Sequence, residues 1–398
     1  HCWDTIPFYR RRLEIAGWEP GSVVTQEVLA RVPVLTREQL QAHNLDVRSP
    51  VLPPEHGPAI ESQTSGSTGQ PVKFLTTEIT RVMWSALTVR HHLWHERELF
   101  GKLFSIRTSH GPVQTQPKIL KNWSGPASTV FETGPAVVID CRLDVNYLLD
   151  WLITEEPHNL LGPPSTLEAM ARLSLERGVQ VRGLRSVETY AETLTPPVRE
   201  LIKQAWRAPV QDMYTSQELG YIALQCPQHE HYHVQSESLF VEVLDDDGQP
   251  SRPGEIGRVV ATSLLNFASP LIRYEMRDYA EAAATCGCGR GLDVIRRIVG
   301  RHRNLVARPD GGRFWPVLET KAWASAAPIR QMQLVQKTPQ RFEARLVMDR
   351  PLRDDEQTRL TAALQTSLGY PFDFDFTLHS QWLRSPTGKF ETVVSEVS

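Results

Sequence analysis

Short apolar runs alternate with helix-like stretches over residues 101–215, and this alternation constrains the fold more than any other feature of the chain. Residues 103–106 and 136–139 have the apolar character of buried strands, whereas residues 146–152 and 165–175 have helical length and spacing. Strands that alternate with helices build a mostly parallel sheet covered by helices. The sequence therefore predicts an α/β fold.

Two loops in this region follow predicted strands, at residues 109–111 and 162–165. Ligands bind to open α/β sheets in the loops beyond the carboxyl ends of the strands. We therefore expect His110 and Gly162 to contact a substrate. An ordinary loop histidine is the alternative for His110.

Between residues 234 and 280 the sequence pattern becomes typical of β-strands. Residues 239–244 and 257–262 are two apolar runs on either side of the turn signal Asp-Asp-Asp-Gly, which predicts a β-hairpin. Beyond a junction near Gly300, the chain reads as two strands, a helix ended by Gly369 and a further strand. This order predicts a large N-terminal α/β domain with a β subdomain at 1–302, and a small mobile α+β domain at 303–398.

Composition excludes several classes of protein. A chain of 398 residues with 40% hydrophobic and 22% charged residues fits a globular protein of two or three domains. The formal net charge of −3 shows no excess of basic residues of the kind that binds nucleic acid. No apolar run is long enough to cross a bilayer, and no signal peptide is visible. We therefore expect a cytoplasmic protein that binds neither nucleic acid nor membrane.

Residues 63–71, with the sequence Gln-Thr-Ser-Gly-Ser-Thr-Gly-Gln-Pro, combine hydroxyls and glycines in a short loop. Glycines allow positive φ angles and close backbone approach, and successive backbone N–H groups in such a turn form a site for anions. The segment predicts a loop that holds a polyphosphate. It is not a Walker A loop, because Lys73 comes four residues after Gly69. A flexible Ser/Gly linker is the alternative.

Two carboxylates follow predicted β segments. Glu218 lies beyond a strand at 210–213, where a carboxylate can hold Mg²⁺ against phosphate oxygens. Its alternative role is to favour the dipole of a following helix. Asp278 ends another β segment and can accept both hydroxyls of a ribose. Its alternative is a surface ion pair with a neighbouring arginine.

Lys389 follows Gly388 in a turn-rich loop near the end of the chain. A lysine on such a loop is a mobile point charge that can neutralise a carboxylate and a phosphate together. A solvated surface lysine is the alternative.

Five cysteines and a run of histidines suggest a metal centre instead of a disulfide framework. Cys226 precedes a cluster of histidines, and Cys286 and Cys288 are separated by one glycine. Three cysteines and one histidine make a closed tetrahedral zinc site with no open position, which is typical of structural zinc. The fourth ligand would be one of the histidines that follow Cys226.

Taken in order, the motifs at 64–71, 214–218, 273–278, 300–301 and 388–389 resemble those of the adenylate-forming superfamily. Within it, the chain looks like the branch of the phenylacetate–CoA ligases and their capsule-cluster relatives. The Cys-Gly-Cys-Gly-Arg run at 286–290 is similar to the zinc knuckle of that branch, and this resemblance implies His233 as the fourth zinc ligand, with His231 as the alternative. The resemblance extends from about residue 6 to residue 389.

The resemblance implies a role for each matching residue. The phosphate-binding loop would comprise Thr64, Ser65, Gly66, Ser67, Thr68 and Gly69. The remaining nucleotide contacts would be Glu192, Tyr214, Thr215, Asp278 and Arg301, with Glu218 as the Mg²⁺ ligand. The acid pocket would include Tyr190, His110 and Gly162. Lys389 would bridge the substrate carboxylate and the α-phosphate, and Arg303 would act as the hinge.

The chain departs from the family pattern at three places. Arg277 precedes the aspartate where the phenylacetate enzymes usually have glycine, and Arg303 stands where the hinge is usually Asp or Lys. Residues 100–145 do not follow the phenylacetate pattern, so that substrate is not implied.

The expected function is an ATP- and Mg²⁺-dependent ligase that activates a carboxylic acid as an acyl-adenylate. An aromatic acid, such as a hydroxy- or aminobenzoate, is expected because Trp84, Trp94, Trp123, Tyr190 and Tyr214 are available for a flat apolar pocket. The acceptor would be coenzyme A, a carrier thiol, or a hydroxyl or amine, and a homodimer is one expected assembly. The alternatives are a non-catalytic interaction module on the same fold and a zinc-ribbon nucleic-acid protein, against which the acidic balance counts.

Overall fold

The computed structural model describes residues 1–64, 71–108, 111–316, 318, 323–385 and 388–397. The chain divides into two compact units. The first comprises His1–Gly101, Lys121–Pro135 and Gln211–Val299, and the second comprises Lys102–Leu120, Ala136–Val210 and Gly300–Ser398. The predicted domain boundary after residue 302 falls inside the second unit and stays a prediction. No helix among the described residues is long and apolar enough to span a membrane.

Short helices build the N-terminal part of the first unit. They are α1 (Cys2–Thr5), α2 (Pro7–Ile15), α3 (Gln26–Arg31), α4 (Arg37–Ala42), η1 (Pro54–His56), α5 (Glu78–Trp94) and α6 (Gly125–Val130). Thr36 and Gln39 form a reciprocal capping box that fixes the start of α4. Buried side chains on α2 and α4, including Tyr9 and Leu40, pack with Tyr274 into one apolar cluster.

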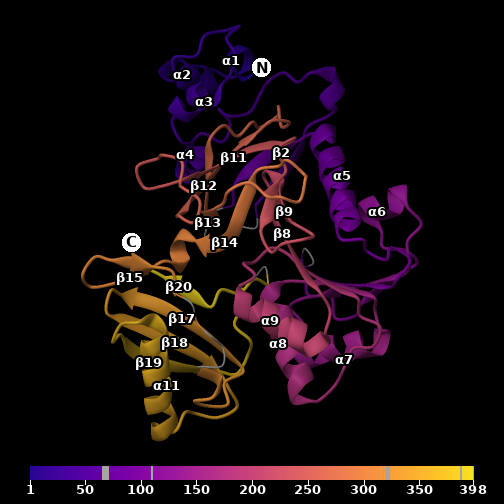
Figure 1. The fold of residues 1–398 in the computed structure, drawn as a ribbon, viewed down its shortest axis with the longest axis vertical. Helices are drawn as coiled ribbons and strands as arrows, with labels where there is room; N and C mark the ends of the chain where they lie inside the picture. Colours follow the sequence, from indigo (N-terminus) through magenta and orange to yellow (C-terminus); the bar gives the residue numbers. More distant parts are fainter. Residues whose placement is uncertain (65–70, 109–110, 317, 319–322, 386–387, 398) are drawn as a thin grey trace. The chain divides into compact units, whose positions relative to one another are not determined.

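A mainly antiparallel sheet forms the rest of the first unit (Figure 1). Its strands are β8 (Val210–Ser216), β9 (Gly220–Gln225), β10 (Tyr232–Val234), β11 (Leu239–Leu244), β12 (Ile256–Ser263), β13 (Tyr274–Ala282) and β14 (Val294–Arg301). They are hydrogen-bonded in the order β11-β12-β13-β14-β10-β9-β8. The predicted hairpin is confirmed, since β11 and β12 pair antiparallel with Val243 opposite Val259.

The second unit contains the predicted parallel sheet. Its strands are β3 (Leu103–Arg107), β4 (Lys118–Leu120), β5 (Ala136–Asp140), β6 (Asn159–Gly162) and β7 (Ser186–Thr189), in the order β7-β6-β3-β5-β4. All neighbours are parallel except the edge strand β4. The helices α7 (Val145–Glu155), α8 (Pro164–Glu176) and α9 (Pro196–Trp206) lie side by side (Figure 1). Their buried side chains form one apolar cluster with those of the strands. The α/β fold class is therefore confirmed.

The C-terminal part of the second unit has a separate apolar core. A sheet in the order β19-β18-β17-β20 comprises β17 (Gln331–Thr338), β18 (Arg341–Val347), β19 (Asp373–His379) and β20 (Val393–Ser395). Helix α11 (Asp354–Leu368) buries Leu360, Leu364 and Leu368 in this core and ends at Gly369, whose φ of 63° is left-handed. Three short elements precede it: η2 (His302–Asn304), β15 (Val306–Ala307) and β16 (Arg313–Phe314). The strands and helix predicted here are present.

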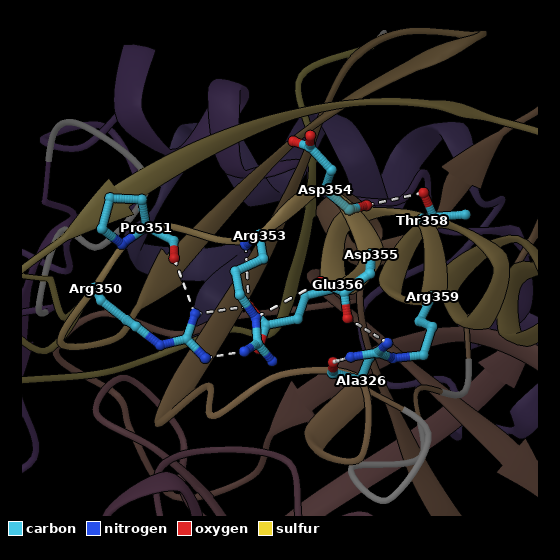
Figure 2. A network of polar contacts seen from close by, with 9 residues as sticks. All are labelled: Ala326, Arg350, Pro351, Arg353, Asp354, Asp355, Glu356, Thr358 and Arg359. Atoms are coloured by element: carbon cyan, nitrogen blue, oxygen red, sulfur yellow. Dashed lines mark hydrogen bonds and ion pairs between the residues drawn. The ribbon is translucent and has the colours of Figure 1, made fainter.

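Figure 2 shows the polar network at the start of α11. The side chain of Arg350 donates two hydrogen bonds of 2.7 Å to the Glu356 carboxylate, and Arg353 donates one of 2.9 Å. The backbone N–H of Arg353 donates a further bond of 3.0 Å to Glu356. These bonds, led by those from Arg350, lower the pKa of Glu356 to about 2. The network fixes the first turn of the only long helix described in this core.

Candidate active site

The predicted phosphate loop connects two antiparallel strands, β1 (Ile60–Gln63) and β2 (Lys73–Thr76). Thr64 lies at its base, where its N–H donates to the Val72 carbonyl and its Oγ1 accepts from the Val72 N–H, each at 2.9 Å. Ser65, Gly66, Ser67, Thr68 and Gly69 lie outside the described residues. The loop therefore belongs to a β-hairpin, unlike a Walker A loop, which joins a strand to a helix.

Tyr214 and Asp278 meet although they lie on different strands of the first unit. The Tyr214 hydroxyl, from β8, donates a hydrogen bond of 2.8 Å to Oδ2 of Asp278, from β13. Thr215 follows Tyr214 in the same strand. The two residues predicted to contact the nucleotide thus share one bond, which orients the carboxylate.

Glu218 lies in the short turn between β8 and β9. Burial raises the pKa of its carboxyl group, a hydrogen bond from its own backbone N–H and the Arg37 guanidinium lower it, and the negative charge of Asp278 raises it further. Two carboxylates that interact electrostatically beside an arginine are a setting in which a divalent cation would be well placed. A helix N-terminus is not its setting, because β9 follows directly at Gly220.

Arg277 occupies the position before Asp278 where the family usually has glycine. Its φ is +61°, in the left-handed region that glycine adopts without a steric penalty. Its side chain forms an ion pair with Glu38 on α4. An arginine therefore replaces the usual glycine here at the cost of a strained backbone conformation, and its side chain is held by the ion pair with Glu38.

In the second unit, Tyr190 and Glu192 follow β7. The Tyr190 hydroxyl donates to the Ile106 carbonyl at 3.0 Å, and burial raises its pKa. Glu192 accepts two backbone hydrogen bonds, from Ser165 at 3.0 Å and from Phe390 at 2.9 Å. Burial raises the pKa of Glu192, while these N–H groups and the charge of Lys389 lower it. Lys389 therefore lies near Glu192.

Ser385 and Lys389 lie close together near the end of the chain. Ser385 and Lys389 exchange backbone and side-chain bonds, from the Ser385 N–H to the Lys389 carbonyl at 2.8 Å and from the Lys389 N–H to Ser385 Oγ at 3.1 Å. Gly388 has a φ of +79°, and a Cβ there would lie 2.6 Å from Sγ of Cys141. Only glycine fits this position, which explains why the lysine is preceded by one.

Three of the remaining predicted residues lie in the described part of the chain. Gly162 ends β6, and a Cβ on it would lie 3.0 Å from the Leu167 side chain. The Arg301 N–H donates to Oδ1 of Asn304 at 2.7 Å, and Arg303 forms an ion pair of 2.5 Å with Glu391. His110 lies outside the described residues.

Two arginines in these clusters were not predicted as site residues. The Arg37 side chain donates to Oγ1 of Thr64 at 3.2 Å, and its charge acts on Glu218. Arg384 lies five residues before Lys389, and its Nη1 is buried with no hydrogen-bond partner among the described residues. Proximity to Lys389 in the sequence was a signal for Arg384, whereas Arg37, far from the loop in the sequence, gave none.

Two of the tryptophans expected in a substrate pocket are used elsewhere. Trp123 is buried, and its Nε1 donates to the Gly101 carbonyl at 2.8 Å. Trp94 packs edge-on to His233 with a centroid distance of 5.8 Å. The expectation of an aromatic acid therefore loses part of its basis.

The predicted metal ligands converge in the first unit. The ligand atoms of Cys226, His231, His233 and Cys286 all lie within 4.8 Å of one another. The Sγ of Cys288 lies 3.3 Å from Nε2 of His233. The structure thus groups both candidate histidines with Cys226 and Cys286, and Cys288 adjoins His233.

The chemistry of this cluster fits zinc. Nε2 of His231 is buried and has no hydrogen-bond partner among the described residues, which suits a metal ligand. Although burial opposes it, hydrogen bonds led by those from Arg290 lower the pKa of Cys288 to about 7. A thiolate is the form in which cysteine binds a metal.

Comparison with known proteins places these clusters in context. No family model matches the chain. It is 23% identical to the phenylacetate–coenzyme A ligase of Thermus thermophilus over 322 residues, covering 77% of this chain and 68% of that protein. It is 21% identical to the protein CapK of Staphylococcus aureus over 392 residues, covering 95% and 82%.

Solved structures share the fold. A 2-hydroxyisobutyryl-CoA ligase in the postadenylation state, in complex with 2-HIB-AMP, matches with a TM-score of 0.74 and 18% identity over 99% of this chain and 86% of that one. An anthranilate CoA ligase in complex with anthranoyl-AMP matches with a TM-score of 0.59 and 14% identity, covering 83% and 65%.

Proposed function

Because the chain belongs to the phenylacetate–CoA ligase-like branch of the adenylate-forming superfamily, we propose that it activates a carboxylic acid with ATP and passes the acyl group to coenzyme A. The observation that carries this proposal is the convergence of Tyr214, Glu218 and Asp278 from separate parts of the first unit. These are side chains that a nucleotide and its metal require.

In the first half-reaction, a carboxylate oxygen of the acid attacks the α-phosphorus of ATP, and pyrophosphate leaves. The acid is already ionised at neutral pH, so the enzyme needs no general base for this attack. The difficulty is to bring two anions together, and positioned positive charges reduce it. Lys389 would neutralise the carboxylate and the α-phosphate, Asp278 would hold the ribose hydroxyls, and Thr64 with its loop would hold the outer phosphates.

Glu218 would hold Mg²⁺, which supplies charge neutralisation at the phosphates when bound. In the second half-reaction, the coenzyme A thiolate attacks the acyl carbon, and AMP leaves with the electron pair of the broken bond. A carrier thiol, a hydroxyl or an amine could take the place of coenzyme A by the same chemistry.

Two classes of acid are candidates for the substrate. Tyr190 and Tyr214, which the family resemblance assigns to the acid and nucleotide sites, favour an acid with a flat ring. Small aliphatic hydroxy acids are the competing class, because two of the expected tryptophans are used in packing.

Zinc is proposed as a structural component. Cys226, Cys286 and Cys288 with one of His231 and His233 would complete a tetrahedral site. Such a site has no open position, so the metal would stabilise the β subdomain and take no part in catalysis.

A screen for acid-dependent pyrophosphate release tests the function. The purified chain is supplied with ATP and Mg²⁺ and with aromatic and aliphatic acids in turn, and the control omits the acid. Release that depends on one acid class supports the ligase. If no acid stimulates release and ATP–Mg²⁺ produces no thermal shift, the chain is instead a non-catalytic interaction module.

A further inference from the structure

We infer that Glu192 is the positioning residue that holds the Lys389 loop in place for adenylation, an inference that rests on the proposed ligase function. Its Oε1 accepts a hydrogen bond of 2.9 Å from the N–H of Phe390, the residue directly after Lys389. Its Oε2 accepts one of 3.0 Å from the N–H of Ser165. One carboxylate thus joins the lysine loop to the parallel-sheet part of the second unit.

The Ser165 side of this contact is rigid. Ser165 lies in the first turn of α8, after Pro163 and Pro164, neither of which has an N–H group. The Ser165 N–H is therefore the first donor available at this helix end. A carboxylate is favoured there by both hydrogen bonding and the helix dipole.

The lysine side is held by its own backbone bonds. The bonds between Ser385 and Lys389 tie the lysine backbone to Ser385, so that one further bond at Phe390 fixes Lys389 from both sides. Gly388 seats the loop against Cys141 without space for a side chain. The loop is thus held by shape at Gly388 and by a charge-assisted hydrogen bond at Phe390.

The backbone before Glu192 is arranged for this contact. Ala191 adopts a φ of +68°, which is rare for a residue with a Cβ and is kept only where the surroundings require it. The Tyr190 hydroxyl anchors the same segment to Ile106. Since both oxygens of Glu192 accept backbone hydrogen bonds, its carboxylate serves the loop, and a nucleotide contact at this segment would come from other groups.

Two substitutions at Glu192 separate this role from a nucleotide contact. Glu192→Ala removes both bonds, and Glu192→Gln keeps an acceptor on one side only. We expect adenylation to fall by on the order of 10²-fold for the alanine variant and about 10-fold for the glutamine variant. The Michaelis constant for ATP should stay unchanged, and so should acyl transfer from a chemically prepared acyl-adenylate. The matched control is Glu200→Gln, on the exposed face of α9, which should leave both half-reactions unchanged.

A double-mutant cycle with Lys389→Ala is the decisive measurement. If Glu192 acts only through the lysine, adding Glu192→Ala to Lys389→Ala causes no further loss of adenylation. Losses that multiply would overturn the inference, and so would a tenfold rise in the Michaelis constant for ATP at unchanged turnover. Parallel losses in both half-reactions with a lower melting temperature would make Glu192 a structural residue, which also overturns it. A wild-type chain without adenylation by any acid would instead remove the proposed function on which the inference rests.

Discussion

Glu218 and Glu192 are both glutamates whose pKa is raised by burial, but their surroundings differ. Glu192 directs its oxygens at two backbone N–H groups, from Ser165 and Phe390. Glu218 has local hydrogen bonds, from its own backbone N–H and from Ser216, and it also interacts with two charges, the attracting Arg37 and the repelling Asp278. The Glu192 carboxylate therefore links two segments of the chain, whereas the Glu218 carboxylate lies among charges whose balance a bound cation would alter.

The comparison teaches that burial and a raised pKa do not distinguish a catalytic carboxylate from a positioning one. The identity of the partners does. A carboxylate that joins backbone N–H groups of two distant segments is part of the scaffold for another residue, whereas one beside a like charge is destabilised until a cation arrives. The two glutamates should therefore respond differently to substitution.

The largest effect is expected at the residue that Glu192 positions. Lys389→Ala should reduce adenylation by on the order of 10²-fold or more, because one preorganised charge next to the reacting phosphate is lost. If the C-terminal part moves away after adenylation, acyl transfer from a prepared acyl-adenylate should proceed at a nearly normal rate. Separate assays of the half-reactions measure this. Equal losses in both would make Lys389 a general structural residue.

Glu218→Gln should reduce adenylation by on the order of 10²-fold, because a neutral amide binds Mg²⁺ poorly beside the phosphates. Part of the loss should be recovered at high Mg²⁺ concentration, which is not expected for any variant of Glu192. Rates measured over a Mg²⁺ titration test this. A loss that does not depend on Mg²⁺ would remove the distinction between the two glutamates.

The melting temperature of Glu218→Gln relative to the wild type should depend on pH. Because the folded-state pKa of Glu218 is raised, its charged form opposes folding above its ordinary pKa, and this cost disappears as the pH falls below that value. Glu218→Gln should therefore melt at a higher temperature than the wild type at pH 8 and at the same temperature at pH 4. Thermal unfolding at both pH values, without ligands, provides the comparison.

Much of the fold could be predicted, since it depends on local signals. The hairpin of β11 and β12 and the end of α11 at Gly369 were readable from turn residues and periodicity. The convergence of Cys226 with Cys286 was also predictable, because few other arrangements use cysteines and histidines in this pattern.

The contacts that define the candidate site were less accessible to prediction. The bond from Phe390 to Glu192 joins residues 198 positions apart, and it depends on how two preformed loops meet. Ala191 and Arg277 adopt left-handed backbone although neither is glycine, so the sequence gives no sign of it. Trp94 and Trp123 show that counting aromatic residues does not locate a pocket, because packing uses the same side chains.

Asp278→Ala should have a smaller effect, raising the Michaelis constant for ATP by about 10-fold with little change in turnover. Its ribose contact would be made in the ground state and the transition state alike. Tyr214→Phe is the matched control for its orientation, since it removes the hydroxyl that donates the bond of 2.8 Å to Asp278 and contacts Sδ of Met276 at 3.6 Å. An unchanged Michaelis constant in Asp278→Ala, together with unchanged turnover, would count against the assignment.

The cysteine and histidine cluster is separate from both Glu192 and Glu218, and substitutions there should affect stability more than catalysis. Cys286→Ser should lose zinc and lower the melting temperature, because a structural zinc contributes folding energy. At temperatures well below melting, both half-reactions should fall by the same factor, of about 2 to 3. Elemental analysis that finds no zinc in wild-type protein prepared without chelator would contradict the metal assignment.

The smallest effect is expected at a third glutamate. The pKa of Glu356 is lowered to about 2 from an ordinary value of 4.5, so its contribution to stability is present above pH 4.5 and is lost as the pH falls towards 2. Glu356→Gln should lower the melting temperature by about 2 °C at pH 7 and by less at pH 3. A difference that stays constant over this range would mean that packing, and not charge, explains the effect.

The central claim, formation of an acyl-adenylate, is tested most directly by following oxygen. An acid that supports pyrophosphate release is labelled with ¹⁸O in its carboxylate and incubated with the wild-type chain, ATP, Mg²⁺ and coenzyme A, and the nucleotide product is analysed by mass spectrometry. The account predicts AMP that carries one ¹⁸O atom, because the oxygen that attacks the α-phosphorus stays with AMP when the thiolate takes the acyl group. Unlabelled AMP, or ADP with the label in inorganic phosphate, would contradict it.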